Sequence, residues 1–329
     1  MSAESSWQPD PLLDGYQMRQ WRLLDAKFAP KEPSDQPLTA TLVRRNEPQH
    51  RRAVIFLHGW DDYFFQTHLA DWFFAQGFDF YALELRRYGR NLRDGLRGGY
   101  IDDLTEYFTE LDQARAIVLA EGHEQWLLNA HSTGGLTAAL WADARPGCVD
   151  GVILNSPWLA MQMGSQALWR GIQPLTALVA KLDPGMGLHV DLPPHYLRTI
   201  DAAQEGDFPL DRRFKGHETF QTRIGWANTV LAQQRRIADG ELNIEAPVLA
   251  MSSARSQAMS QKWDEGMRTA DVILDADRIA AAAALVGSDV SIRRIDGAVH
   301  DLVLSQEPAR SQTFEVMAEW IDQKLPAKA

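Results

Sequence analysis

A serine in a turn of small residues is the first candidate for chemistry. Residues 125–140 show an apolar run that ends in the pentapeptide 130–134 (AHSTG) and is followed by an Ala- and Leu-rich segment. This order predicts a strand, a sharp turn and a helix with Ser132 at the apex, which is the pattern of a nucleophile elbow. Ala130 stands where the pattern usually has glycine. An ordinary strand-to-helix turn is the simpler alternative, so the rest of the sequence must decide between them.

A serine hydroxyl needs a base to take its proton, a carboxylate to orient that base, and donors for the developing oxyanion. His300 is the preferred base among the nine histidines, because it follows an apolar run through a loop and lies downstream of Ser132. The chain order serine, acid, histidine requires that position. Most of the other histidines fall in predicted loops, helix ends or a predicted lid.

The acid is sought between the last two predicted strands. This segment offers Asp264, Asp271, Asp275 and Asp277. Asp271 is favoured because apolar residues and a second acid follow it, and Asp275 is the second choice. The alternative for any of these aspartates is a solvated carboxylate or a helix cap.

Two backbone amides are expected to form the oxyanion hole. The amide of Thr133 begins the helix after the serine, where unpaired N–H groups face anions. The amide of Trp60 follows a glycine that lets the chain turn inward after an upstream strand. Residues predicted to bind substrate lie beside these turns: His58, Gly59, Tyr63, Phe64, His131 and Trp158.

Strands and helices alternate around these candidates. Strands are expected at 39–45, 53–57, 78–85, 125–131, 149–155, 246–251 and 290–295, and helices at 71–76, 101–120, 133–144, 274–285 and 311–324. This alternation predicts an α/β fold with a mostly parallel central sheet and helices on both faces. It stops in a stretch rich in proline and aromatic residues. We therefore expect an inserted, mainly helical lid at 157–245, between core segments at 1–156 and 246–329.

Composition bounds the possible partners. The 329 residues carry a formal net charge of -11, which argues against a nucleic-acid partner. Cys148 is the only cysteine, so an intrachain disulfide and a cysteine-based zinc site are excluded. No metal constellation, signal peptide or membrane span is evident, and a cytoplasmic location is the default expectation. The oligomeric state stays open.

The His-Gly-Trp turn at 58–60, the serine elbow and the Gly-Ala-Val-His loop at 297–300 together resemble the α/β-hydrolase superfamily. The closest likeness is to its monoacylglycerol lipase, lysophospholipase and serine aminopeptidase-like group, over about 40–155 and 246–325. A loop at 84–91 is similar to the group's Asp-x-Arg-Gly-x-Gly-x-Ser loop, although Glu84 and Arg87 depart from it. The additional residues 252–270, between a predicted strand and Asp271, are a second departure from the pattern of this group.

This resemblance implies esterase, lipase or amidase chemistry without a metal or organic cofactor. We expect a serine carboxylester hydrolase that forms an acyl-enzyme on a small-molecule ester with an apolar acyl or aromatic group. A serine aminopeptidase or amidase, an acyltransferase and a non-catalytic binding protein of the same fold are the alternatives.

Five arginines between positions 86 and 97 form a basic cluster: Arg86, Arg87, Arg90, Arg93 and Arg97. The cluster is expected to be a solvated loop paired with Glu84, Asp94, Asp102 and Asp103. Steering of an anionic substrate is the alternative.

Overall fold

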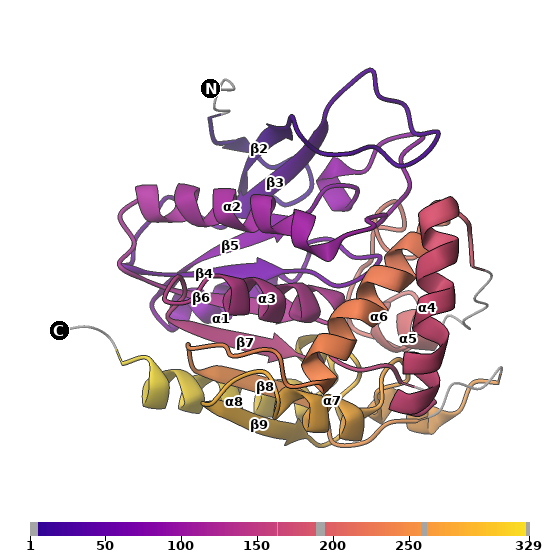
Figure 1. The fold of residues 1–329 in the computed structure, drawn as a ribbon. Coiled ribbons are helices and arrows are strands. Elements are labelled where there is room, and N and C mark those ends of the chain that lie inside the picture. The colour runs from indigo at the N-terminus through magenta and orange to yellow at the C-terminus, as the bar shows by residue number, and fades with distance from the viewer. Residues whose placement is uncertain (1–5, 163, 189–194, 258–261, 327–329) are drawn as a thin grey trace. The chain divides into compact units, whose positions relative to one another are not determined.

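The computed structural model describes residues 6–162, 164–188, 195–257 and 262–326 (Figure 1). The chain divides into two compact units. The first unit comprises Met1–Trp126, Gln166–Val190 and Asp211–Ala232, and the second comprises Leu127–Ser165, Asp191–Leu210 and Gln233–Ala329. Each unit takes part of the segment predicted to be a lid. The three-part organisation with a lid at 157–245 stays a prediction.

Among its described residues, the first unit contains five strands: β1 (Gln8–Pro9), β2 (Gln17–Leu23), β3 (Leu38–Arg44), β4 (Arg52–Leu57) and β5 (Phe78–Glu84). The pairs β1–β2, β2–β3 and β3–β5 are antiparallel, whereas β4 and β5 are parallel. Every residue of β5 is buried. A strand buried on both faces has a continuous apolar sequence, which explains why this run does not alternate.

The helices of the first unit are α1 (Thr67–Ala75), α2 (Phe108–Ala120), α4 (Gln166–Leu182) and the larger part of α6 (Ile224–Ala238). Helix α1 packs against β5, and α2 packs against β4 and β5. After α1 the chain turns at Gly77, whose φ of 80° lies in the left-handed region that glycine adopts without a steric penalty.

The second unit is built on parallel strands. β6 (Gln125–His131), which begins at the unit boundary, pairs with β7 (Gly151–Asn155), β7 with β8 (Val248–Ser253), and β8 with β9 (Val290–Ile295). Its helices are α3 (Thr133–Ala144), α5 (His195–Ile200), α7 (Ala276–Ala283) and α8 (Ala309–Lys324). Because parallel strands end at the same edge, the loops after β6, β7, β8 and β9 bring their residues together there.

The predicted α/β class with a mostly parallel sheet is confirmed, and the predicted strands lie within two residues of the observed ones. Helix α1 begins four residues earlier than expected. The start of the helix predicted at 101–120 is instead a short 3₁₀ turn over Leu104–Tyr107. Among the described residues, no helix combines the length and apolar character that crossing a membrane requires.

The prediction that the arginine cluster is a solvated loop is wrong for three of its members. The Arg86 side chain is 3% exposed and pairs with Glu106 and Glu110, and the Arg87 side chain is 1% exposed and pairs with Glu32. The expected partners Asp94, Asp102 and Asp103 do not form these ion pairs. Since a buried charge requires a partner, these arginines and carboxylates must be buried together.

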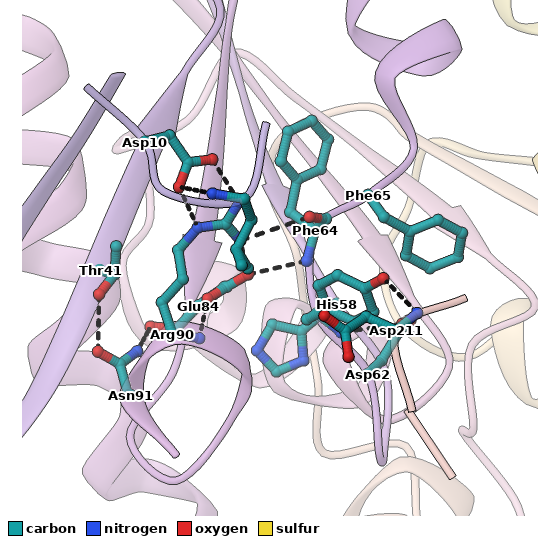
Figure 2. A network of polar contacts seen from close by, with 12 residues as sticks. Asp10, Thr41, His58, Asp62, Phe64, Phe65, Glu84, Arg90, Asn91 and Asp211 are labelled. Carbon is teal, nitrogen blue, oxygen red and sulfur yellow. Dashed lines mark hydrogen bonds and ion pairs between the residues drawn. The ribbon is translucent and has the colours of Figure 1, made fainter. Parts of the chain in front are cut away.

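Arg90 holds the N-terminal extension against the loop after β5. Figure 2 shows its guanidinium between the carboxylates of Asp10, at 2.5 Å, and Glu84. Glu84 also accepts a hydrogen bond from the backbone N–H of Phe64 at 2.9 Å. The side chain of Asn91 donates to the Glu84 carbonyl and accepts from Thr41. These contacts fix the segment that follows the His-Gly-Trp turn.

We expect Arg90→Met to lower the free energy of unfolding by about 3–5 kcal/mol, because it leaves two carboxylates buried without a cation. Urea denaturation measures this change. Arg51→Met is the matched control: the Arg51 side chain is 78% exposed and pairs with the half-exposed Glu124, so its loss should change stability little. Equal effects of the two substitutions would contradict the role given to Arg90.

Candidate active site

Ser132 occupies the turn between β6 and α3. Its φ of 53° and ψ of -117° are unusual for a residue with a side chain. The Ser132 N–H donates to the Asn155 carbonyl at 3.0 Å, and the Ser132 carbonyl accepts from the N–H of Trp158 at 2.9 Å. These two hydrogen bonds fix the turn, and the small residues on either side of Ser132 leave room for this backbone conformation.

A hydrogen-bonded chain of three side chains lies within the second unit. The Ser132 Oγ is 2.9 Å from His300 Nε2, and His300 Nδ1 is 2.8 Å from Asp271 Oδ2. The three residues are 7%, 2% and 0% exposed, respectively. With Nδ1–H donating to the carboxylate, Nε2 is free of its proton and can accept one from the serine hydroxyl.

The structure brings Asp271, and not Asp275, to His300. The other oxygen of Asp271, Oδ1, accepts from the N–H groups of Ile273 and Leu274, both at 2.8 Å. Asp275 instead caps helix α7, where its carboxylate accepts from the N–H groups of Asp277 and Arg278 at 3.0 Å. The second-choice acid therefore has a local structural task of its own.

The detour at 252–270 returns the chain to the strand edge before Asp271. The Asp271 N–H donates to the Arg255 carbonyl at 2.9 Å, and the Asp271 carbonyl accepts from the Gln257 N–H at 2.9 Å. Asp271 thus forms an isolated parallel bridge with Ser256, just beyond the end of β8. The insertion lengthens the loop without moving the carboxylate away from this edge.

Asn155 links the serine turn to the histidine loop, and the sequence analysis did not single it out. Its carbonyl accepts from Ser132, while its side-chain amide donates to Asp301 Oδ1 at 2.7 Å and accepts from the N–H of Leu302 at 3.2 Å. Asn155 and Asp301 are 2% and 0% exposed. The signal available in the sequence was a polar residue ending the buried run of β7.

Two aromatic rings flank the His300 imidazole. The ring of His131, one of the predicted substrate-binding residues, lies 4.8 Å from it between centroids, and the ring of Tyr196 lies 5.4 Å away at nearly a right angle. His131 Nδ1 is also 3.2 Å from the Asn155 carbonyl. Tyr196 was missed because the stretch around it has no recognisable periodicity. The Trp158 indole donates to Gln162, within the same unit.

The His-Gly-Trp turn lies in the first unit. His58 Nε2 accepts from the Leu85 N–H at 3.1 Å, and Nδ1 lies 2.8 Å from the Gly59 carbonyl. Burial lowers the pKa of His58, so its ring is neutral. The Trp60 ring packs on Trp226 at 4.2 Å between centroids. Both nitrogens of His58 are therefore occupied by contacts that shape the turn.

Tyr63 and Phe64 follow the turn and are both buried. The Tyr63 hydroxyl accepts from the N–H of Asp211 at 3.0 Å, and its ring lies 5.4 Å from Phe214. Phe64 packs among core aromatic rings, 5.2 Å from Phe80. These contacts account for both residues as packing side chains, and their substrate-binding role stays a prediction. The catalytic and oxyanion roles predicted for the other residues are likewise proposals.

The fold and the serine turn together define the class of α/β-hydrolases. A family model described as serine aminopeptidase, S33, matches residues 48–307, and the chain belongs to this family. The family match confirms the predicted resemblance. No curated protein matches the chain.

Solved structures share the fold at low sequence identity. A monoacylglycerol lipase from Paleococcus ferrophilus is 20% identical, with a TM-score of 0.58, 82% of this chain and 94% of that chain covered. A soluble variant of monoglyceride lipase from Saccharomyces cerevisiae is 14% identical, with a TM-score of 0.59 and coverages of 98% and 96%. A thermostable carboxyl esterase from Bacillus coagulans is 12% identical, with a TM-score of 0.61 and coverages of 94% and 99%.

Asp61, next to the Trp60 turn, carries a strongly perturbed carboxyl group. Its oxygens accept from the N–H groups of Gly216 and His217, at 2.8 and 3.3 Å. Burial nevertheless raises its pKa to about 7, against the lowering effect of the Lys215 charge and these two bonds. Between about pH 4 and pH 7 the folded chain therefore binds a proton at Asp61 that the unfolded chain releases.

We expect this group to make the protein less stable as pH rises from about 4 to 7. Asp61→Asn removes the titration, so its stability relative to the wild type should increase over that pH window. Urea denaturation at several pH values measures the difference. Asp14→Asn, at an exposed position, is the control. A pH-independent difference for Asp61→Asn, or the same trend in the control, would contradict the assignment.

Proposed function

We propose that the chain is a serine hydrolase that cleaves carboxylic esters through an acyl-enzyme on Ser132. The observation that carries the proposal is the hydrogen-bonded chain from Ser132 through His300 to Asp271. A serine, an imidazole and a buried carboxylate in this order are the groups that activate a hydroxyl for acyl transfer. Membership of a hydrolase family supports the same chemistry.

In the proposed mechanism, His300 Nε2 takes the proton of the Ser132 hydroxyl as Oγ attacks the substrate carbonyl. The backbone N–H groups of Thr133 and Trp60 would donate to the oxyanion. His300 then gives its proton to the leaving alcohol. In the second step it takes a proton from water, which attacks the acyl-enzyme, and it returns this proton to Ser132 Oγ as the bond between Oγ and the acyl carbon breaks and the acid is released. Asp271 keeps the imidazole in the required tautomer and stabilises its protonated form.

An ester is the proposed substrate class, with an apolar acyl or aromatic group. A monoacylglycerol lipase and a carboxyl esterase share the fold of this chain, and they support an ester as the substrate. We propose that the reaction needs no metal or organic cofactor and that the protein has no nucleic-acid partner. We also propose a cytoplasmic location.

The family description also raises a serine aminopeptidase as a second candidate. This activity requires free carboxylates for the substrate amino terminus, and six acids of the segment 157–245 could supply them: Asp183, Asp191, Asp201, Glu205, Asp207 and Asp211. Glu205 pairs with Arg198 and Arg268, and Asp211 pairs with Arg213. Asp207 lies 3.5 Å from Arg310. Asp191 lies outside the described residues. Three of the six acids are therefore engaged in ion pairs, which weakens this second candidate.

A p-nitrophenyl ester series from acetate to palmitate tests the proposal. We expect turnover of short or medium esters, with kcat reduced about 10³-fold or more in Ser132→Ala and in Asp271→Asn. Asp275→Asn is the matched control, because asparagine also caps helices and should leave kcat nearly unchanged.

Wild-type activity that persists in Ser132→Ala would refute the mechanism. Loss in Asp275→Asn instead of Asp271→Asn would move the acid. Hydrolysis of amino-acid arylamides without ester hydrolysis would favour the aminopeptidase, and product transfer to an added alcohol in competition with water would favour an acyltransferase. No turnover and no reaction with a fluorophosphonate would favour a binding protein.

A further inference from the structure

Two arginines in the first unit converge on one backbone oxygen. Arg97, the last member of the arginine cluster, donates from Nη1 to the Gly185 carbonyl at 3.3 Å. Arg223 donates from Nη1 to the same oxygen at 2.9 Å. The two guanidinium groups therefore lie side by side, although they come from positions more than a hundred residues apart.

Backbone pairing fixes the position of this carbonyl. The N–H of Gly225 donates to the Pro184 carbonyl at 3.0 Å, and the N–H of Ile224 donates to the Met186 carbonyl at 2.9 Å. A Cβ at Gly185 would lie 2.4 Å from Nη1 of Arg97 and would displace this guanidinium. The close approach of the guanidinium thus depends on glycine at this position.

The charge of this arginine pair is not balanced by a direct ion pair. Arg86, Arg87 and Arg90 each contact a carboxylate, but within the described ranges no carboxylate forms an ion pair with Arg97 or Arg223. Two acids that influence the pKa of Arg223, Asp183 and Glu32, have other partners. The carboxylate of Asp183 accepts from the Gly185 N–H at 3.1 Å.

Glu32 is likewise occupied. Its carboxylate pairs with the guanidinium of Arg87 and accepts from the backbone N–H of Arg97. The pKa of Arg223 is lowered, first by burial and then by the positive charge of Arg97, against the raising effects of Tyr100, Glu32 and Asp183.

Two hydrogen-bond donors at the arginine pair lack an acceptor among the described residues. Arg223 Nε and the Tyr100 hydroxyl are buried and have no hydrogen-bond acceptor in the part of the chain that the structure describes. Tyr100 lies close enough to Arg223 to influence its pKa. A guanidinium group presents several N–H donors in one plane, a geometry that matches the oxygens of a phosphate or carboxylate.

We propose that Arg97 and Arg223 form a binding site for a phosphate group, either as the free ion or as part of a phosphate monoester. A dianion balances the two guanidinium charges, and its oxygens can accept from both side chains at once. The proposal concerns binding and is independent of the proposed hydrolysis, since neither arginine belongs to the Ser132, His300 and Asp271 chain.

Calorimetric titration of the full chain with inorganic phosphate, at constant ionic strength, tests this site. We expect saturable binding by the wild type and at least tenfold weaker binding by Arg97→Gln and by Arg223→Gln. Arg93→Gln is the matched control, because among the described residues Arg93 donates to the carbonyls of Gln36 and Pro37 and not to the Gly185 carbonyl. Circular dichroism and ester hydrolysis establish that each variant is folded.

Titration with glycerol 3-phosphate distinguishes the two sources of the phosphate group: tighter binding than inorganic phosphate identifies a monoester, and weaker binding identifies the free ion. If a glutamine variant unfolds, Arg223→Lys replaces it and should weaken binding while retaining the charge. Absence of saturable binding by the wild type, an equal loss in Arg93→Gln, or equally tight binding of acetate would overturn the proposal.

Discussion

The backbone conformation of Ser132 is the constraint on which the candidate site depends. A residue with a side chain held at a φ of 53° costs about 1–3 kcal/mol and persists only where its surroundings impose it. Here the Asn155 carbonyl and the Trp158 N–H hold the two peptide groups of the turn. Pro157 packs directly against Gly135, because a Cβ at position 135 would lie 2.7 Å from the Pro157 side chain. The strain is therefore stabilised by packing, and it directs the hydroxyl toward His300.

The same strand edge positions the other two side chains. Asn155 ends β7, and its side chain holds the loop that carries His300 through Asp301 and Leu302. Asp271 reaches the edge by pairing its backbone with Arg255 and Gln257 after a long detour. Three loops of different length thus position Ser132, His300 and Asp271 at one edge of the sheet, because parallel strands end on the same side of the sheet.

Much of this could be predicted from local sequence patterns. Buried parallel strands appear as continuous apolar runs, and the small residues around Ser132 identify the turn. The buried ion pairs of the arginine cluster could not be predicted, because Asp10 and Glu32 lie 80 and 55 positions away from Arg90 and Arg87. A charged residue has the same sequence signature whether water or a distant carboxylate surrounds it.

Local patterns favoured Asp271 as the acid but left Asp275 as a second choice. The position of Asp271 depends on its bridge with Ser256, which spans the detour. The role of Asn155 was hidden, since only its tertiary contacts with the histidine loop distinguish it from any polar residue at a strand end. Local patterns thus indicated which elements form, whereas long-range contacts decided which polar groups face one another.

The central claim is that His300 activates Ser132 as a nucleophile. The most direct measurement is the rate of reaction with a fluorophosphonate, followed by intact mass and peptide mapping, in the wild type and in His300→Ala. The account predicts a single adduct on Ser132, formed at least about 100-fold more slowly without the imidazole. No adduct on Ser132 in the wild type, or equal rates in the two proteins, would contradict it.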